Sequence, residues 1–575
     1  TDPRAELARL IEAALPWTPP AGEGDDAADA PAGVGEVGEA TRADDIRAAL
    51  WRISQEARLT STERNRAMAA AVVKWLHRRG RFYFHAERRD FGSVMFFNAE
   101  TKALLPVQSD GFVAWLSDVL AINRAERPFA FIQNAIETEG LSDRATGIVP
   151  AVCWAGTDTG IFLSMGPGRV ARIRAEGVDV VDNGTDGVLF PYGATLAPWN
   201  LCDPADPFEA CKLFRDMATA AAHGFDLFRL WAISLPSDQR TKPPLVLPGD
   251  IGAGKTAVVR GLFELFGIPP KIGAVLKNGE ADFWTAQDAG GLVCLDNADT
   301  SIDWLPDALA AAATGGAQVK RRLYTDNSEI VLRARAWTAI TSASPTFASD
   351  AGLADRLLVV RLERRRGETA ETALGDEIRA HRDAGLSFIA HTLARALADT
   401  APVPGGLNSR HPDFAALAVR IGRALGREAE AIAALRAAEA DKHLFNLEND
   451  AVGAALLELV SRGPFEGRAA DLLEALREVD GATFEKMGAK RLGKRLGKLW
   501  PHLECALRAS KAVEGRDKVT VYRFAGFAGF QTVFLEKSLT RENKGTFPKT
   551  LNETPQTPHD RLAGAEEVLI DDLPY

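Results

Sequence analysis

Residues 245–267 read LVLPGDIGAGKTAVVRGLFELFG, and they restrict the architecture more than any other part of the sequence. A short apolar run ends at a glycine, a loop of small residues follows, and an amphipathic segment comes next. The apolar run predicts a buried strand, and the amphipathic segment predicts a helix. The loop matches the pattern G-x4-G-K-[ST], with Gly249, Gly254, Lys255 and Thr256 at the defining positions.

A loop of this composition suits a polyphosphate. Glycines lack a Cβ and tolerate positive φ, so several backbone N–H groups can point at one anion, and the following helix adds its positive dipole end. We therefore predict ATP and Mg²⁺ as cofactors, with Lys255 at the β- and γ-phosphates and the Thr256 hydroxyl on the metal. The predicted nucleotide-binding residues are Gly249, Asp250, Ile251, Gly252, Ala253, Gly254, Lys255, Thr256 and Ala257.

A second strand carries the acid that such a metal requires. Residues 291–299 read GLVCLDNAD, in which an apolar run ends at Asp296, so we predict Asp296 as the carboxylate on the metal side. Asn297 follows, where many ATP-hydrolysing proteins carry a second acid that orients water. Either Asp299 serves instead, or Asn297 holds the water and hydrolysis is slower or differently arranged.

A third apolar run, WTAIT, ends at Thr341 and predicts another strand. Thr341 or Ser342 can contact the γ-phosphate or the attacking water there, unless the end of the strand simply faces solvent. Arg356 precedes a further apolar strand and can neutralise charge in the site of a neighbouring copy, an effect of about 10³–10⁵ in rate. Arg361 and the arginines at 364–366 are predicted to be solvated.

The composition is that of a multidomain protein. At 575 residues, of which 46% are hydrophobic, the chain can build several cores. The five cysteines lie far apart without a CxxC pair, which predicts buried thiols in a reducing compartment and argues against zinc. No apolar run is long enough to span a membrane and no signal-peptide pattern is present, so we expect a cytoplasmic protein.

Changes in composition divide the chain into units. Residues 16–45 are rich in Pro, Gly, Ala, Asp and Glu and predict an acidic linker after a short N-terminal helix. An alternating pattern around a D-F-G turn predicts a β-hairpin within residues 81–97. The fold class is α/β, and its predicted units are a helix and flexible linker (1–45), an N-terminal α/β domain (46–207), a P-loop ATPase domain (208–370), a helical region (371–450), a winged-helix-like unit (451–526) and a flexible tail (527–575).

The net charge is −10, but a local excess of positive charge lies near the end of the chain. Residues 486–523 hold eleven Lys or Arg against three acids. Helical spacing places a basic face opposite leucines, and a charged turn and a strand follow, which is typical of a winged helix whose basic helix binds DNA. The alternative is a solvated amphipathic helix packed on the rest of the protein. The predicted DNA-binding residues of this helix are Lys490, Arg491, Lys494, Arg495 and Lys498.

The order of these motifs resembles a known family. The phosphate loop, the L-D-N strand, the turn at 314–316 before Arg322–Asp326, the T-S-A-S-P strand and the arginine of G-L-A-D-R follow one another as in superfamily-three-like AAA+ helicases. The resemblance is to the replication proteins of phages and mobile elements that are related to pox-virus-type primase-helicases. It is clearest over residues 245–365 and more diffuse over 70–245.

The resemblance implies an ATP-dependent DNA helicase in the replication of a phage, plasmid or integrated mobile element. It implies a homo-hexameric ring that moves along one DNA strand in its pore and separates duplex or forked DNA. No primase signature is evident in the sequence, so a primase or polymerase that takes part would be a separate partner. Lys320, Arg321 and Arg322 would then lie on or near a hairpin that faces the pore and contact the DNA backbone. Without the family match, this basic run is equally well a solvated surface.

Two positions depart from the pattern of that family. Such helicases carry paired acids where this chain has Asp296 and Asn297. They also carry an asparagine at the end of the third strand, where this chain has Thr341, Ser342 and Ala343. The second functional hypothesis is therefore a nucleotide-switched DNA-binding protein, such as an initiator, a loader or a defence ATPase, that assembles on DNA without unwinding it.

Overall fold

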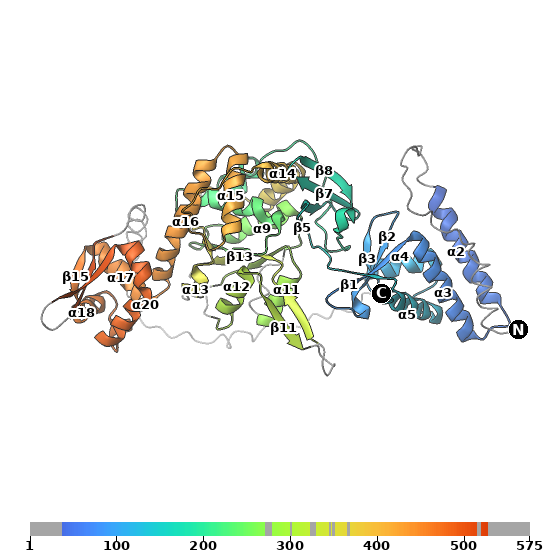
Figure 1. The fold of residues 1–575 in the computed structure, drawn as a ribbon, viewed down its shortest axis with the longest axis horizontal. Coiled ribbons are helices and arrows are strands. Elements are labelled where there is room, and N and C mark those ends of the chain that lie inside the picture. Colours follow the sequence, from blue (N-terminus) through green and yellow to red (C-terminus); the bar gives the residue numbers. More distant parts are fainter. Residues whose placement is uncertain are drawn as a thin grey trace, which may run out of the picture.

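The computed structural model describes residues 37–270, 279–298, 302–321, 329–343, 345, 347, 351–364, 369–514 and 519–526. Along the longest axis of the chain, Figure 1 shows an N-terminal body, a large central body and a C-terminal body. The helix predicted at the N-terminus, the tail predicted after residue 526, Asp299 and Arg322 all lie outside the described residues.

The N-terminal body is a four-stranded sheet packed against helices. Its elements are α2 (Val37–Gln55), α3 (Ser61–Arg79), β1 (Gly80–His85), η1 (Phe91–Ser93), β2 (Val94–Asn98), β3 (Leu104–Pro106), α4 (Asp110–Leu120), α5 (Arg127–Gly140) and β4 (Thr146–Ile148). The sheet order is β3-β2-β1-β4. The predicted hairpin is confirmed, because β1 pairs antiparallel with β2 and places Phe82 opposite Phe96. Helix α2 begins at Val37, inside the segment predicted as a linker, and corrects that boundary.

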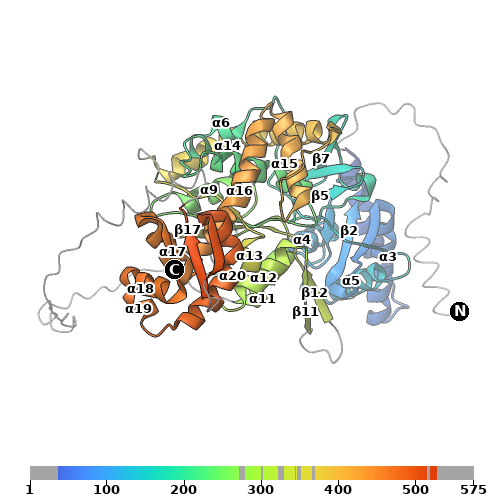
Figure 2. The ribbon, with the colours of Figure 1, turned by 60° about the vertical axis from the view of Figure 1, so that its left-hand side comes forward.

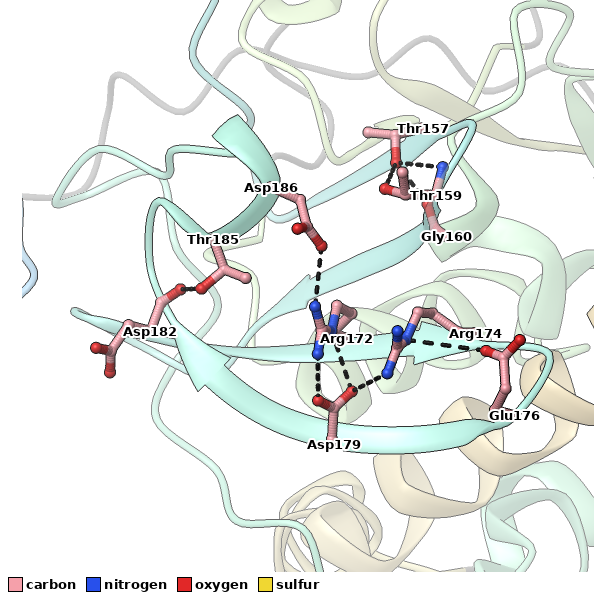
Figure 3. Close-up of polar contacts among 10 residues, drawn as sticks. All are labelled: Thr157, Thr159, Gly160, Arg172, Arg174, Glu176, Asp179, Asp182, Thr185 and Asp186. Carbon is pink, nitrogen blue, oxygen red and sulfur yellow. Dashed lines mark hydrogen bonds and ion pairs between the residues drawn. The ribbon is translucent and has the colours of Figure 1, made fainter. Parts of the chain in front are cut away.

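A second sheet is an antiparallel meander, drawn in Figure 3. It consists of β5 (Trp154–Thr157), β6 (Gly160–Ser164), β7 (Arg169–Arg174) and β8 (Gly177–Asp182), followed by η2 (Thr185–Gly187). The guanidinium of Arg172 on β7 joins β8 to the turn after it. Its Nη2 lies 2.7 Å from Oδ2 of Asp179, and its Nη1 lies 3.1 Å from Oδ2 of Asp186.

The central body contains a parallel sheet in the order β10-β13-β9-β14. The strands are β9 (Leu245–Pro248), β10 (Leu292–Leu295), β13 (Trp337–Ser342) and β14 (Leu358–Val359). The helices of this body are α6 (Pro207–Ala210), α7 (Lys212–Arg215), α8 (Gly224–Ser234), η3 (Leu235–Ser237), α9 (Lys255–Phe266), α11 (Glu280–Asp288), α12 (Leu305–Ala313), α13 (Ala351–Ala354), α14 (Glu371–Ala398), α15 (Pro412–Ala424) and α16 (Glu428–Glu448). Because all neighbouring strands are parallel, the loops at their carboxyl ends meet at one edge.

One hydrophobic core joins regions that the sequence analysis separated. Trp154 of β5 and Ile378 of α14 are buried in the same cluster as Val258 of α9. The β5–β8 sheet therefore belongs to the central body. The predicted N-terminal domain of residues 46–207 is thus split between the N-terminal and central bodies. The helices predicted as a separate region at 371–450 likewise cover the parallel sheet and share its core.

The β11–β12 hairpin projects from the central body in both views (Figures 1 and 2). Strand β11 (Ala317–Arg321) pairs antiparallel with β12 (Glu329–Arg333), so that Lys320 lies opposite Ile330 and Arg321 opposite Glu329. Two of the three residues predicted to contact DNA here thus lie on β11, in agreement with the expectation of a hairpin.

The C-terminal body combines helices with a small sheet. Its elements are α17 (Ala451–Arg462), β15 (Phe465–Arg468), α18 (Ala469–Val479), α19 (Gly481–Phe484), α20 (Ala489–Leu507), β16 (Ala509–Glu514) and β17 (Val519–Phe524). The strands pair antiparallel in the order β15-β17-β16. The basic helix α20 and the strand after the charged turn agree with the sequence-based prediction, whereas β15, which is only four residues long, was not predicted.

The cysteines and the helices bear on two further expectations. None of the five cysteines forms a disulfide, and Cys153, Cys211 and Cys294 are buried as expected, whereas Cys202 and Cys505 are exposed. None of the helices in the described part of the chain is long and apolar enough to cross a membrane.

Candidate nucleotide-binding site

The predicted phosphate loop connects β9 to α9, as the sequence pattern requires. Gly252 and Gly254 have φ of 84° and 80°, the left-handed conformation that favours glycine. Gly254 is also the N-cap of α9, and no side chain caps this helix end. The first N–H groups of a twelve-residue helix are therefore open to an anion, which fits a bound phosphate.

Gly249 is required by a close approach of two backbone segments. A Cβ on Gly249 would lie 2.4 Å from the carbonyl oxygen of Leu362, a separation that backbone atoms do not tolerate. The amide of Leu362 in turn donates to the carbonyl of Pro248 at 2.8 Å. The segment that leaves β14 thus packs directly on the phosphate loop, where only glycine fits.

Lys255 is held inside the loop that it follows. Its side chain is buried, and its Nζ donates to the carbonyl oxygens of Gly249 at 2.7 Å and Asp250 at 3.1 Å. The ammonium therefore lies among the loop residues that are predicted to surround the phosphates.

Asp296 joins the ends of two strands to the helix that follows the phosphate loop. It directly follows β10, and its Oδ1 accepts hydrogen bonds from the hydroxyls of Thr256 at 2.8 Å and Thr341 at 2.6 Å. Thr256 is the second residue of helix α9, which follows the phosphate loop, and Thr341 lies near the end of β13. A hydroxyl and a carboxylate side by side are the oxygen ligands that Mg²⁺ accepts, so Thr256 and Asp296 fit this metal.

The two hydroxyl side chains at the end of β13 contact the loop that follows β10. Thr341 and Ser342 are fully buried, so a strand end that faces solvent is ruled out. Thr341 donates to Asp296 and also accepts from the amide of Asn297 at 3.0 Å. Ser342 donates to the carbonyl of Ala298 at 3.2 Å. In this structure both hydroxyls are therefore engaged with the loop after β10, and the hydroxyl of Thr341 orients the acid.

Asn297 leaves the site without a second carboxylate at this position. Its backbone is left-handed, with φ of 54°, and its side chain is exposed. Its Nδ2 lies 3.5 Å from Oδ2 of Asp296, beside the carboxylate. An amide so placed can hold water by hydrogen bonds but is a far weaker base than a carboxylate.

Arg356 makes its contacts away from the phosphate loop of its own chain. Its Nη1 donates to the carbonyl of Gly352 in α13, and its own carbonyl lies 3.0 Å from Nε2 of His411. His411 is almost completely buried, and this burial lowers its pKa to about 4. The neutral ring therefore donates to the Arg356 carbonyl, a positioning role that the sequence analysis missed because the two residues are distant in sequence.

Arg361 corrects the prediction of a solvated side chain. Its Nη2 lies 2.7 Å from Glu448 and its Nε lies 3.4 Å from Asp441, both on α16. The guanidinium also stacks on the ring of Phe445, at 5.6 Å from the ring centroid. Burial opposes its charge, but the two carboxylates outweigh this effect and raise the pKa of Arg361. Arg364 is exposed, as predicted.

Helix α20 presents most of its predicted basic face to solvent. Lys490, Arg491, Lys494 and Lys498 are exposed. Arg495 is different, because it forms an ion pair with Asp450 at the start of α17. One of the five residues predicted to bind DNA is therefore engaged within the protein.

Comparison with known proteins supports a role in replication. Residues 211–444 match the family described as actinomycete integrative conjugative element replication protein. This segment is less than half of the chain, but it contains the phosphate loop, Asp296, Thr341 and Arg356. The region is thus related to replication proteins of mobile elements. No curated protein matches the chain.

Solved structures give only a weak likeness. Two apo structures of the NrS-1 C-terminal region, one of them an A form, each match with a TM-score of 0.37 and 10% sequence identity. Each match covers 79% of this chain and 98% of the solved chain. A similarity this weak supports neither a shared fold nor a shared activity.

Proposed function

We propose that the protein is an ATP-dependent DNA motor, a helicase that acts as a hexameric ring in the replication of a mobile element. The observation that carries this proposal is the pair of hydrogen bonds that Asp296 accepts from Thr256 and Thr341. They bring a metal-binding acid to the start of the phosphate-loop helix, as nucleotide hydrolysis requires. The family match supplies the replication context.

The order of the parallel strands supports an AAA+ core. Strand β13 lies between β9, which precedes the phosphate loop, and β10, which precedes Asp296. ATP hydrolysis would supply the free energy for movement. Within each chain, Lys255 and the loop amides would bind the phosphates, while Thr256 and Asp296 would hold Mg²⁺. Arg356 would act on the nucleotide of a neighbouring chain, since its contacts in its own chain lie elsewhere.

Two surfaces support binding of DNA. In the C-terminal body, a helix, a strand, three further helices and a two-stranded hairpin follow one another, an order that fits a winged helix. The basic helix α20 directly precedes the hairpin. The β11–β12 hairpin, which carries Lys320 and Arg321, projects from the central body and suits contact with a strand in the pore of the ring (Figure 2). Both surfaces would bind phosphates and carry little sequence information.

The proposal is tested with the full chain, ATP, Mg²⁺ and a forked DNA duplex. We expect DNA to stimulate ATP hydrolysis and ATP to drive strand separation. Both activities should disappear in Lys255→Ala, which removes the cation of the phosphate loop. Arg260→Ala is the matched control, because Arg260 lies on the same helix and pairs with Glu371. A wild-type protein that binds neither ATP nor DNA at low salt would refute the proposal.

The second candidate is a nucleotide-switched DNA-binding protein that holds ATP without unwinding DNA. Asn297 favours it, because an exposed amide stands beside Asp296 where a second acid would activate water. Asn297→Glu separates the two functions. If Asn297→Glu hydrolyses ATP much faster than the wild type, the natural residue restrains hydrolysis and the switch is favoured. If the wild type separates DNA strands and Asn297→Glu hydrolyses ATP no faster, the helicase is favoured.

A further inference from the structure

The segment that follows β14 is fastened along the phosphate loop. The amide of Leu362 donates to Pro248 at 2.8 Å, and Leu362 forms a parallel bridge with Gly249. The next amide, that of Glu363, donates to the carbonyl of Ala218 at 2.9 Å. The backbone is therefore held on two sides up to the residue before Arg364.

The side chains before Arg364 are fixed in the interior. Leu362 is buried in the main core, and Arg361 is held by the two carboxylates of α16. Because the side chains of Leu362 and Arg361 are both fixed in the interior, the backbone that carries Arg364 is held rigidly beside the phosphate loop.

The guanidinium of Arg364 lies against the middle of this loop. Its Nε lies 3.9 Å from the position that a Cβ on Gly252 would take. Among the residues that the structure describes, no other heavy atom beyond the neighbours of Gly252 comes within 4 Å of that position. Because residue 252 is a glycine, no side chain of its own separates the arginine from the loop amides. Arg364 is also solvent-exposed and thus accessible to a ligand.

Arg364 has no carboxylate partner within the part of the chain that the structure describes. The neighbouring arginines differ in this respect, because Arg361 pairs with Asp441 and Arg260 pairs with Glu371. An exposed guanidinium beside a loop rich in N–H donors has a strong preference for an anion, and its fork of donors matches the oxygens of a phosphate group.

We propose that Arg364 binds the phosphates of the nucleotide held by its own chain. This inference rests on the proposed function and adds a cation that the motif does not contain. Arg364 would act in cis, because the same backbone segment that carries it packs on Gly249. It therefore complements Arg356, which is proposed to act on a neighbouring chain.

The test measures ATP binding by calorimetry with the full chain and Mg²⁺. A charge-assisted hydrogen bond contributes about 1.5–3 kcal/mol, so Arg364→Gln should weaken ATP binding roughly 10–100-fold. Arg364→Lys keeps the charge without the fork and should give an intermediate affinity. Arg260→Gln, whose arginine pairs with Glu371 on the same body, should bind ATP as the wild type does.

The outcomes separate the two proposals. If the wild type binds no ATP, or Lys255→Ala binds as well as the wild type, nucleotide binding by the loop fails. If the wild type binds and Lys255→Ala does not, while Arg364→Gln and Arg364→Lys bind with wild-type affinity, only the role of Arg364 is overturned. Unchanged thermal melting of the variants would show that weaker binding is not caused by unfolding, and the lysine variant gives the result if the glutamine variant does not fold.

Discussion

Arg495 of the basic helix α20 forms an ion pair with Asp450, whose side chain is only 6% exposed. The same carboxylate caps α17, because its Oδ1 accepts from the amides of Val452 at 3.0 Å and Gly453 at 3.1 Å. Arg495 thus ties the basic helix to the first helix of the C-terminal body. Its neighbour Lys494 is exposed and remains available to DNA.

This difference predicts opposite effects for two adjacent residues. Lys494→Gln should weaken DNA binding and reduce the salt dependence of the binding constant by about 0.9 in the log–log slope for one lost phosphate contact. Arg495→Gln should leave that slope unchanged but destabilise the C-terminal body by about 1–3 kcal/mol, because Asp450 loses its partner. Fluorescence anisotropy at several salt concentrations and thermal melting measure the two effects. A reduced slope for Arg495→Gln with unchanged melting would contradict this assignment.

Thr341→Val should impair the site through Asp296. The substitution keeps the shape of a fully buried side chain but removes the hydroxyl that orients the acid. Because such supporting groups contribute about 10–100-fold, we expect a loss of this size in Mg²⁺ affinity or ATP turnover. Titration of ATPase activity with Mg²⁺ checks it.

The matched control for Thr341 lies on the same strand. Thr338 is also buried, and its hydroxyl accepts from Nε2 of Gln287 at 2.8 Å, away from the acid. Thr338→Val should lower stability without changing the Mg²⁺ dependence. Equal Mg²⁺ titrations for both variants would show that Thr341 has no special role.

Arg361→Met should strongly destabilise the central body. The side chains of Arg361 and Glu448 are 15% and 29% exposed, and burial raises the pKa of Glu448 while Arg361 opposes that shift. Removing one partner of a largely buried pair costs about 3 kcal/mol, because the other charge stays behind. Chemical denaturation measures this loss, and Glu448→Leu in the same chain should restore part of it.

A surface arginine provides the comparison for Arg361. Arg410 lies 3.8 Å from Asp355, and both side chains are 53% exposed. Arg410→Met should therefore change the free energy of unfolding by only about 0–1 kcal/mol. A loss as large as that of Arg361→Met would mean that burial does not explain the difference.

His411 should make stability depend on pH. Burial lowers the pKa of His411 to about 4 in the folded chain, whereas its pKa in the unfolded chain is near 6.5. Between these two pH values the unfolded state binds a proton and the folded state does not. Its contribution to stability is present above pH 6.5 and declines as the pH falls toward 4. The loss between pH 7.5 and pH 5 is about 2 kcal/mol.

His411→Gln tests this prediction, because glutamine can donate to the Arg356 carbonyl but does not titrate. Denaturation at both pH values should show a smaller pH-dependent loss in the variant than in the wild type. Identical losses would mean that other buried groups account for the acid sensitivity.

The local sequence pattern was sufficient to predict much of the candidate site. The strand, loop and helix around Gly249 and Lys255 were predicted correctly, and so was the place of Asp296 at the end of its strand. The hairpin at β1 and β2 and the exposed face of α20 were also predicted. In each case neighbouring residues carry the signal, because the periodicity of side chains and the conformational freedom of glycine act over a few positions.

The hydrogen-bond and ion-pair partners of the charged and hydroxyl side chains became known only from the tertiary structure. Whether Arg361 is solvated depends on α16, and whether Arg495 is available to DNA depends on Asp450. Thr341 contacts Asp296 because β13 lies between β9 and β10 in the sheet, although β9 and β10 follow one another along the chain. Burial and pairing depend on which distant segments pack side by side, and no local period encodes that choice.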